Sequence, residues 1–349
     1  VAGNIVGWGG AFSITFALIP DTDLSLWEEQ FSDHLAQGAG EDMLDMYPEE
    51  LRVAINEYLD KGVDFVKYGG TSHWAFPTLI AFSPEAQRVI VEETHARGLI
   101  AEIHSTNPEG LRLSIEAGID LIQHPEVLAD REMSDELVDQ IRERGIICSM
   151  LVNQITGPAW QKHLADKAAA ERRLVAEAEG TDWGRLRRPV HREKTSYQLR
   201  RERNALGYGD EVRRRNAQKL IEGGCIVTLG TDNFAGVAPD FGRTPKPIWG
   251  EPGIGTLLAI EGLVELGMSP GDAIVSATKN GAIAAGQLDE FGTIEVGKLA
   301  DLLVLDASPL QDIKNIRRQS VVMAAGKIID VAALPTDPVY FLQGPLQER

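Results

Sequence analysis

The sequence predicts an α/β fold with a parallel β-sheet, in the form of a (β/α) barrel. Two observations carry this prediction. Short apolar segments rich in β-branched residues alternate with segments of helical length, and the connections between them are short. This alternation is typical of βα units whose parallel strands are buried on both faces. Several short crossovers in succession favour a barrel over an open sheet, although periodicity leaves both architectures open.

The elements can be placed in order along the chain. In the first unit, Val63, Phe65 and Val66 mark a strand. The helix that follows has Ser83 as its N-cap and Pro84 at its first position. The same plan repeats downstream, with a glycine closing each helix before the next strand. We expect strands near residues 63–67, 99–104, 119–124, 146–151 and 225–231, and helices over 83–98, 108–118, 134–145 and 210–224.

The composition excludes several classes of protein. The chain has 349 residues, of which 43% are hydrophobic and 25% charged, so it can bury a large core. The net charge of −18 opposes binding to nucleic acid or to an anionic membrane surface. No apolar run approaches the roughly 18 residues that span a bilayer. Cys148 and Cys225 each lie in an apolar run and are expected to be small buried residues rather than a disulfide or metal site. We expect a cytoplasmic homo-oligomer that acts on a small molecule.

Four residues at strand ends are the candidate functional residues. Lys67 ends the first strand, His104 the second and His124 the third, and Asp232 follows the last. Taken singly, each has an ordinary structural explanation, such as a lysine whose ammonium reaches water or an aspartate that caps a turn. The carboxyl ends of barrel strands form one rim, where active sites lie. Residue types that bind metals recur there in phase with the strands, which predicts a metal site.

Other residues near this rim are weaker candidates. Tyr68 and His73 are expected in the loop beyond Lys67, where either could bind substrate or be an ordinary loop residue. Glu102 lies two residues before His104 and should therefore share its face of the strand. The remaining histidines are expected at the surface: His34, His95, His163 and His191.

Residues 153–215 interrupt the alternation of strands and helices. This segment is rich in charge, and we expect helical hairpins inserted on the rim as a lid. Its basic cluster is more simply a solvated helix face than an anion site (Arg185, Arg187, Arg188 and Arg192). The Pro/Gly-rich stretch after Asp232 is expected to be a rim loop that walls the substrate pocket.

The sequence resembles the amidohydrolase superfamily, which includes imidazolonepropionase-like and prolidase-like enzymes. The matching motifs are VKYGG, EIHS, IQHP and LGTD, together with SPGDAIVSATKNGAIAAG, GTIEVGKLADLLVLDASPL and VVMAAGKIID, which cover nearly all of residues 50–332. The resemblance implies a (β/α)8 barrel over residues 1–287 and strands of a small β-sandwich over residues 288–349. It also implies one or two divalent ions, with zinc as the expected metal.

The resemblance further assigns roles to the strand-end residues. His104 and His124 would be metal ligands, Lys67 a carbamylated lysine that bridges the metals, and Asp232 a ligand and proton shuttle. Two metals roughly 3.5–4 Å apart can activate water to hydroxide near neutral pH. The expected reaction is hydrolysis of an amide-like C–N bond in a dipeptide, cyclic amide, urea or carbamate. Two alternatives stay open: a phosphotriesterase-like or lactonase-like hydrolase, and a metal-free scaffold.

One departure from the family pattern concerns the first barrel strand. The family carries an H-x-H pair there, whereas no two of the seven histidines of this chain are two residues apart. From this resemblance we expect the chain to begin near the position of the third barrel strand. We therefore expect an N-terminal segment, either a separate chain or residues outside this sequence, to supply the first strands and the H-x-H pair.

Overall fold

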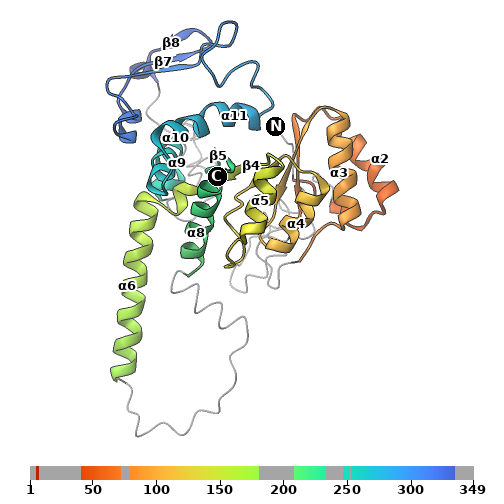
Figure 1. Ribbon diagram of the computed structural model, residues 1–349, viewed down its shortest axis with the longest axis horizontal. Coiled ribbons are helices and arrows are strands. Elements are labelled where there is room, and N and C mark those ends of the chain that lie inside the picture. Colours follow the sequence, from red (N-terminus) through yellow and green to blue (C-terminus); the bar gives the residue numbers. More distant parts are fainter. Residues whose placement is uncertain are drawn as a thin grey trace, which may run out of the picture. The chain divides into compact units, whose positions relative to one another are not determined.

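The computed structural model describes residues 5–7, 41–71, 79–180, 208–232, 247–251 and 253–334 (Figure 1). The chain divides into two compact units. The first contains Val1–Met150 and Trp160–Val227, and the second contains Leu151–Ala159 and Thr228–Arg349. None of the described helices is both long enough and apolar enough to cross a membrane.

A five-stranded sheet forms the centre of the first unit. Its spatial order follows the sequence, and the first three neighbouring pairs are parallel. Val6 adds a bridge beside Tyr68, and the Val6 amide donates to the Lys67 carbonyl oxygen at 2.8 Å. All five predicted strands are confirmed: β1 (Phe65–Gly69), β2 (Ile100–His104), β3 (Leu121–Gln123), β4 (Ile147–Met150) and β5 (Ile226–Leu229).

The predicted helices are also present, and their ends follow the expected capping chemistry. The Ser83 hydroxyl accepts a hydrogen bond from the Ala86 amide, and the Asn107 side chain accepts one from the Gly110 amide. Gly118 ends its helix in the left-handed conformation, with φ of 95°. The helices of this unit are α2 (Pro48–Leu59), α3 (Pro84–Ala96), α4 (Pro108–Ala117), α5 (Asp135–Glu143), α6 (Gly157–Gly180) and α8 (Tyr208–Glu222), after the short 3₁₀ helix η2 (Glu41–Asp45).

The two faces of the sheet differ in chemistry. Successive side chains of a strand point to opposite faces, and the strand register aligns Lys67 with Glu102 and His104 with Gln123. One face is apolar and completely buried (Val66, Tyr68, Ile103, Ile122 and Cys148). The other face carries the polar residues near the carboxyl ends of the strands (Lys67, Glu102, His104, Gln123 and Ser149).

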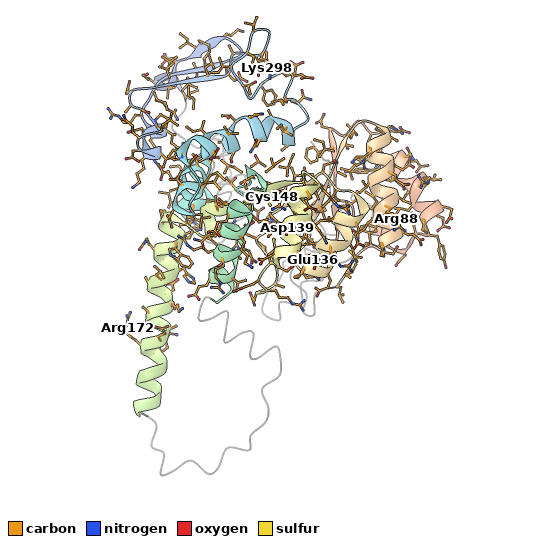
Figure 2. All side chains as sticks on the ribbon, in the orientation of Figure 1. Arg88, Glu136, Asp139, Cys148, Arg172 and Lys298 are labelled. Atoms are coloured by element: carbon orange, nitrogen blue, oxygen red, sulfur yellow. The ribbon has the colours of Figure 1, made fainter. Side chains whose placement is uncertain are left out.

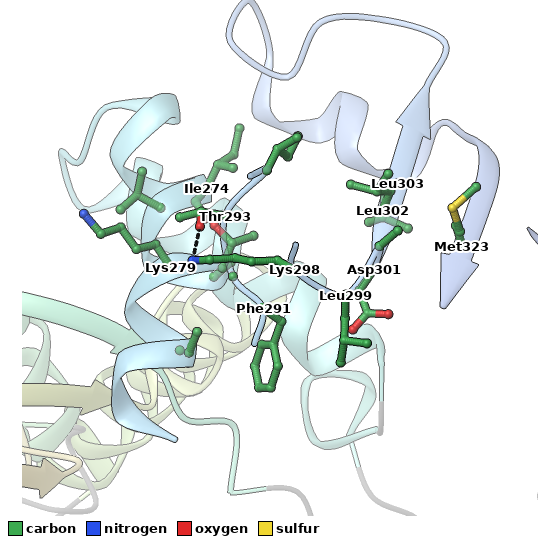
Figure 3. A pocket seen from close by; sticks show the side chains of 18 of the residues that line it. Ile274, Lys279, Phe291, Thr293, Lys298, Leu299, Asp301, Leu302, Leu303 and Met323 are labelled. Carbon is green, nitrogen blue, oxygen red and sulfur yellow. Dashed lines mark hydrogen bonds between the residues drawn. The ribbon is translucent and has the colours of Figure 1, made fainter. Parts of the chain in front are cut away.

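The second unit combines three helices with a small antiparallel sheet. Its helices are α9 (Ile254–Glu265), α10 (Pro270–Ala277) and α11 (Lys279–Ala284), and its sheet has the order β6 (Leu302–Leu305), β7 (Gln319–Ala324), β8 (Lys327–Ile329). Short 3₁₀ helices connect these elements: η3 (Val152–Gln154), η4 (Ile248–Gly250), η5 (Ile313–Arg317) and η6 (Val331–Ala333). A cavity of about 860 Å³ lies in this unit, lined mainly by apolar side chains such as Leu257, Phe291 and Met323 (Figure 3).

The architecture matches part of the expected barrel. A parallel sheet with sequential strand order is the pattern of a (β/α) barrel, and the antiparallel tail sheet was expected. The strands of the described ranges number five in the parallel sheet, so an eight-stranded barrel is not completed within them. Helix α6 confirms helical structure in residues 153–215, while its role as a lid stays a prediction. The basic cluster at residues 185–192 lies outside the described residues.

Candidate metal centre

Two histidines meet at the carboxyl end of the parallel sheet. His104 is the last residue of β2, and His124 directly follows β3. The His124 Nε2 and His104 Nδ1 atoms are 2.7 Å apart, and the ring centroids are 4.5 Å apart in an edge-to-face arrangement. Both side chains are buried, with exposed fractions of 4% and 9%. One imidazole donates and the other accepts, so the accepting ring is neutral.

The backbone at His124 is held in an unusual conformation. Its φ is 41°, in the left-handed region that costs a residue with a side chain about 1–3 kcal/mol. Hydrogen bonds on both sides of the residue maintain this geometry. The His124 amide donates to the Ser149 carbonyl oxygen on β4 at 2.7 Å, and the Val127 amide donates to the His124 carbonyl oxygen at 3.0 Å. Backbone strain of this kind clusters at functional sites.

Lys67 and Glu102 are adjacent on the face that carries His104. Lys67 is half-buried, whereas Glu102 is buried and accepts a hydrogen bond of 2.5 Å from Gln123 Nε2. Burial raises the pKa of Glu102, while the Gln123 hydrogen bond and the Lys67 charge act in the opposite sense. The expectation that Glu102 shares the face of His104 is confirmed.

Asp232 belongs to the second compact unit. It follows β5, its side chain is exposed, and its φ is 47°. Within the described ranges, no group of three or more histidine, cysteine, aspartate or glutamate side chains is close enough to hold a metal ion. A role for Asp232 as a ligand therefore stays a prediction.

The histidine pair fits a metal ion with a small adjustment. Two nitrogen ligands of a tetrahedral zinc ion, each about 2.0–2.1 Å from it, are about 3.3–3.4 Å apart. The observed separation of 2.7 Å is shorter, so the two rings would have to move apart by about 0.6 Å. Neutral imidazole nitrogens are zinc ligands. His104 Nδ1 and His124 Nε2 are therefore the atoms that could hold the ion, with Lys67 on the same face of the sheet.

Tyr68 does not lie where the sequence indicated. It was expected in the loop after Lys67, but it belongs to β1, and its side chain is buried on the face opposite to Lys67. The Tyr68 hydroxyl donates to Gln87 Oε1 at 3.2 Å, and burial raises its pKa. A substrate-binding role for Tyr68 thus has no support from its position. His73, the other candidate of this segment, lies outside the described residues.

The remaining histidines divide into two groups. His95 is exposed in the last turn of α3, as expected, and its Nε2 atom is 2.8 Å from Asp120 Oδ2. The expectation for His163 is wrong, because its side chain is only 8% exposed and stacks on Trp160 with ring centroids 4.5 Å apart. A spacing of three residues places both rings on one side of α6. His34 and His191 lie outside the described residues.

Sequence reasoning missed the residues that support the histidines. Gln123 anchors Glu102, and Ser149 accepts the His124 amide. Asn216, on α8, is buried and holds the segment after His124: its Oδ1 accepts the Met133 amide, and its Nδ2 donates to the Glu126 and Arg131 carbonyl oxygens. The position of Gln123 next to His124 was a signal for the contact between Gln123 and Glu102. Nothing in the nearby sequence indicates the contacts of Ser149 and Asn216.

Comparison with known proteins identifies the class. A protein-family model described as "Amidohydrolase family" matches residues 5–329, so the chain belongs to the amidohydrolase family. Ochratoxinase of Aspergillus niger is 26% identical over 283 residues, which are 78% of this chain and 47% of ochratoxinase. The chain thus spans about half the length of the curated relatives it matches.

Two solved structures are similar over most of the chain. Phenylurea hydrolase B gives a TM-score of 0.74 at 28% identity and covers 97% of this chain and 69% of its own. Molinate hydrolase gives a TM-score of 0.73 at 26% identity and covers 97% of this chain and 67% of its own. These matches confirm the resemblance that the strand-end motifs indicated.

Proposed function

We propose that the complete protein is a metal-dependent hydrolase of an amide-like C–N bond. The observation that carries the proposal is the convergence of His104 Nδ1 and His124 Nε2 at the carboxyl end of the sheet. Membership of the amidohydrolase family supports the reaction class. The name of one similar protein, phenylurea hydrolase B, favours ureas within that class.

The strand-end residues would divide the work. His104 and His124 would hold zinc through neutral imidazoles, and their burial would exclude water from competing for the ion. Lys67 would add an anionic ligand if its amine forms a carbamate with carbon dioxide. When bound, zinc would supply acidification of a water molecule and polarisation of the substrate carbonyl. Asp232 would accept a proton and deliver it to the leaving nitrogen.

Two alternative functions are a different hydrolase on the same metal site and a catalytically inactive scaffold. A phosphotriesterase-type or lactonase-type hydrolase would need the same metal site with a differently shaped pocket, because specificity resides in loops rather than in the fold. A catalytically inactive scaffold would need neither the metal site nor the substrate pocket. The left-handed φ of His124 weighs against a scaffold, since strain without a function is a cost.

The test is a metal and substrate analysis of the full-length protein. Bound metals are counted by inductively coupled plasma mass spectrometry. The protein is then assayed with phenylurea, N-acyl amino acid, lactone and phosphotriester substrates, before and after treatment with a chelator. The proposal expects zinc in the protein and metal-dependent release of amine. A metal-loaded protein that cleaves only lactones or phosphotriesters would establish the alternative hydrolase, and a protein without metal or activity would establish the scaffold.

A further inference from the structure

The two cysteines of the chain form a buried pair that the sequence did not reveal. Cys148 lies in β4, and Cys225 directly precedes β5, the neighbouring strand of the sheet. Both are free thiols, and Cys148 is labelled in Figure 2. Cys148 is completely buried, and Cys225 is 9% exposed. Their side chains are hydrogen-bonded to each other, and Cys225 Sγ also lies 3.8 Å from the Val138 carbonyl oxygen on α5.

We infer that Cys148 and Cys225 form an intrachain disulfide on exposure to peroxide, as a reversible redox modification site. Neighbouring strands are about 4.8 Å apart, within the 4.4–6.8 Å range of Cα separations in disulfides. The two thiols are hydrogen-bonded, and their sulfurs must approach to about 2.05 Å to form the bond. The chain has only these two cysteines, so no other intrachain disulfide competes.

The environment assigns different roles to the two thiols. The hydrogen bond with Cys148 lowers the pKa of Cys225, and Arg142 acts in the same sense, while burial and Asp139 oppose them. The same hydrogen bond, burial and the charge of Glu126 raise the pKa of Cys148. Cys225 is therefore the thiol that ionises first, and it is also the more exposed one. Thiolate character and access decide which cysteine meets an oxidant.

The chemistry balances with hydrogen peroxide as the oxidant. The Cys225 thiolate attacks one peroxide oxygen, which gives a sulfenic acid and hydroxide. Cys148 then attacks the Cys225 sulfur, forms the S–S bond and releases the second oxygen as water. Two thiols and one peroxide become one disulfide and two water molecules. A dithiol reductant reverses the bond by thiol–disulfide exchange.

The position gives the modification a consequence for the histidine pair. Ser149 follows Cys148 directly, and its carbonyl oxygen accepts the His124 amide at 2.7 Å. The disulfide would fix β4 to the start of β5 one residue away from that contact. The inference itself concerns the thiols alone and does not depend on the proposed hydrolase.

The experiment treats the folded, full-length protein with hydrogen peroxide. The reaction is stopped with acid, and the unfolded protein is alkylated with N-ethylmaleimide and measured by intact mass spectrometry. We expect a monomer that lacks two hydrogen atoms and takes up no alkylating agent, and dithiothreitol should restore two reactive thiols. Two thiols that still alkylate, oxygen addition without a link, or a disulfide-linked dimer would each overturn the inference.

Two single variants test the assigned roles. Cys148→Ala should leave Cys225 as a sulfenic acid that dimedone traps. Cys225→Ala should slow oxidation of the remaining thiol by at least about tenfold, because Cys148 is buried and protonated. Circular dichroism checks that both variants are folded. Equal oxidation rates for the two variants would contradict the assignment of Cys225 as the reacting thiol.

Discussion

His124 Nε2 and His104 Nδ1 are 2.7 Å apart at the carboxyl end of the parallel sheet, although 20 residues separate them in the chain. The contact depends on two neighbouring strands ending at the same level and on the left-handed backbone of His124, which turns its ring toward His104. Two imidazole nitrogens that converge at a buried site can serve as zinc ligands in their neutral form.

The first prediction concerns metal retention. His104→Ala and His124→Ala should each weaken zinc binding by more than about 100-fold, because removing even an outer partner of a ligand costs 10–100-fold. Equilibrium dialysis against a zinc chelator, followed by metal analysis, measures the loss. His95→Ala is the matched control, since that histidine is exposed and pairs with Asp120. Wild-type metal content in both site variants would show that the pair is purely structural.

The second prediction concerns Lys67. If the lysine becomes an anionic ligand, Lys67→Ala should lower activity by at least about 100-fold, and acetate or propionate should restore part of it by occupying the carbamate position. Lys61→Ala is the control, because Lys61 is exposed and lies over the Tyr58 ring. The proximity of Glu102 to Lys67 favours the competing state, a lysine that stays cationic. In that state carboxylic acids would restore nothing.

The third prediction concerns the start of α4. A Cβ atom at Gly110 would lie 2.2 Å from Thr71 Cγ2, and Thr71 is fixed by its hydrogen bond from the Thr106 amide at 2.8 Å. Gly110→Ala should therefore reduce the free energy of unfolding by about 1–3 kcal/mol, measured by urea denaturation. Gly271, near the start of α10, has its nearest neighbour at 3.8 Å. Gly271→Ala should leave stability unchanged or raise it by up to about 1 kcal/mol, and an equal loss in both variants would contradict the steric argument.

The fourth prediction concerns the segment that follows His124. Asn216→Ala removes three hydrogen bonds to backbone groups of this segment, two of them buried, and should cost about 2–4 kcal/mol of unfolding free energy. Gln218→Ala on the same helix is half-buried and should change stability by less than about 0.5 kcal/mol. Hydrogen exchange should show faster exchange at the Met133 amide in the Asn216 variant. Unchanged exchange there would mean that other contacts hold the segment.

The fifth prediction concerns pH and the buried carboxyl of Glu102. Its pKa is raised in the folded state, so the folded protein binds more protons than the unfolded chain at pH values just above the ordinary value of 4.5. Ionisation of Glu102 therefore removes stability as the pH rises through this range. Glu102→Gln should abolish that contribution. The free energy of unfolding of the variant minus that of the wild type should therefore increase as the pH rises, in metal-free buffer.

Glu93 is the control with the opposite sign. The Asn56 hydrogen bond and the Arg52 guanidinium lower the pKa of Glu93, so its contribution is present above 4.5 and is lost as the pH falls. Glu93→Gln should therefore reduce the dependence of stability on pH on the acid side. Denaturant titrations at a series of pH values measure both variants, and identical trends would contradict the opposite shifts.

The local sequence determined the elements and their order. Ser83 with Pro84 marked the start of a helix, Gly118 marked an end, and apolar runs marked all five strands of the parallel sheet. These features depend on capping, backbone freedom and burial within a few residues, so they can be predicted from the sequence. The metal-ligand types at the strand ends were legible too, because parallel strands end at one edge of a sheet.

Only the tertiary structure decided which side chains meet. The face of β1 on which Tyr68 lies depends on strand alternation and on helix packing, and it placed Tyr68 against Gln87 rather than beside Lys67. Three further contacts show the same dependence. His163 stacks on Trp160 from the same face of one helix. Cys148 meets Cys225, and Asn216 binds the segment after His124, although these partners are far apart in the chain. Such contacts arise because packing brings whole helices and strands together. The partner of a side chain then depends on the register and rotation of those elements, which the residues next to it in sequence do not determine.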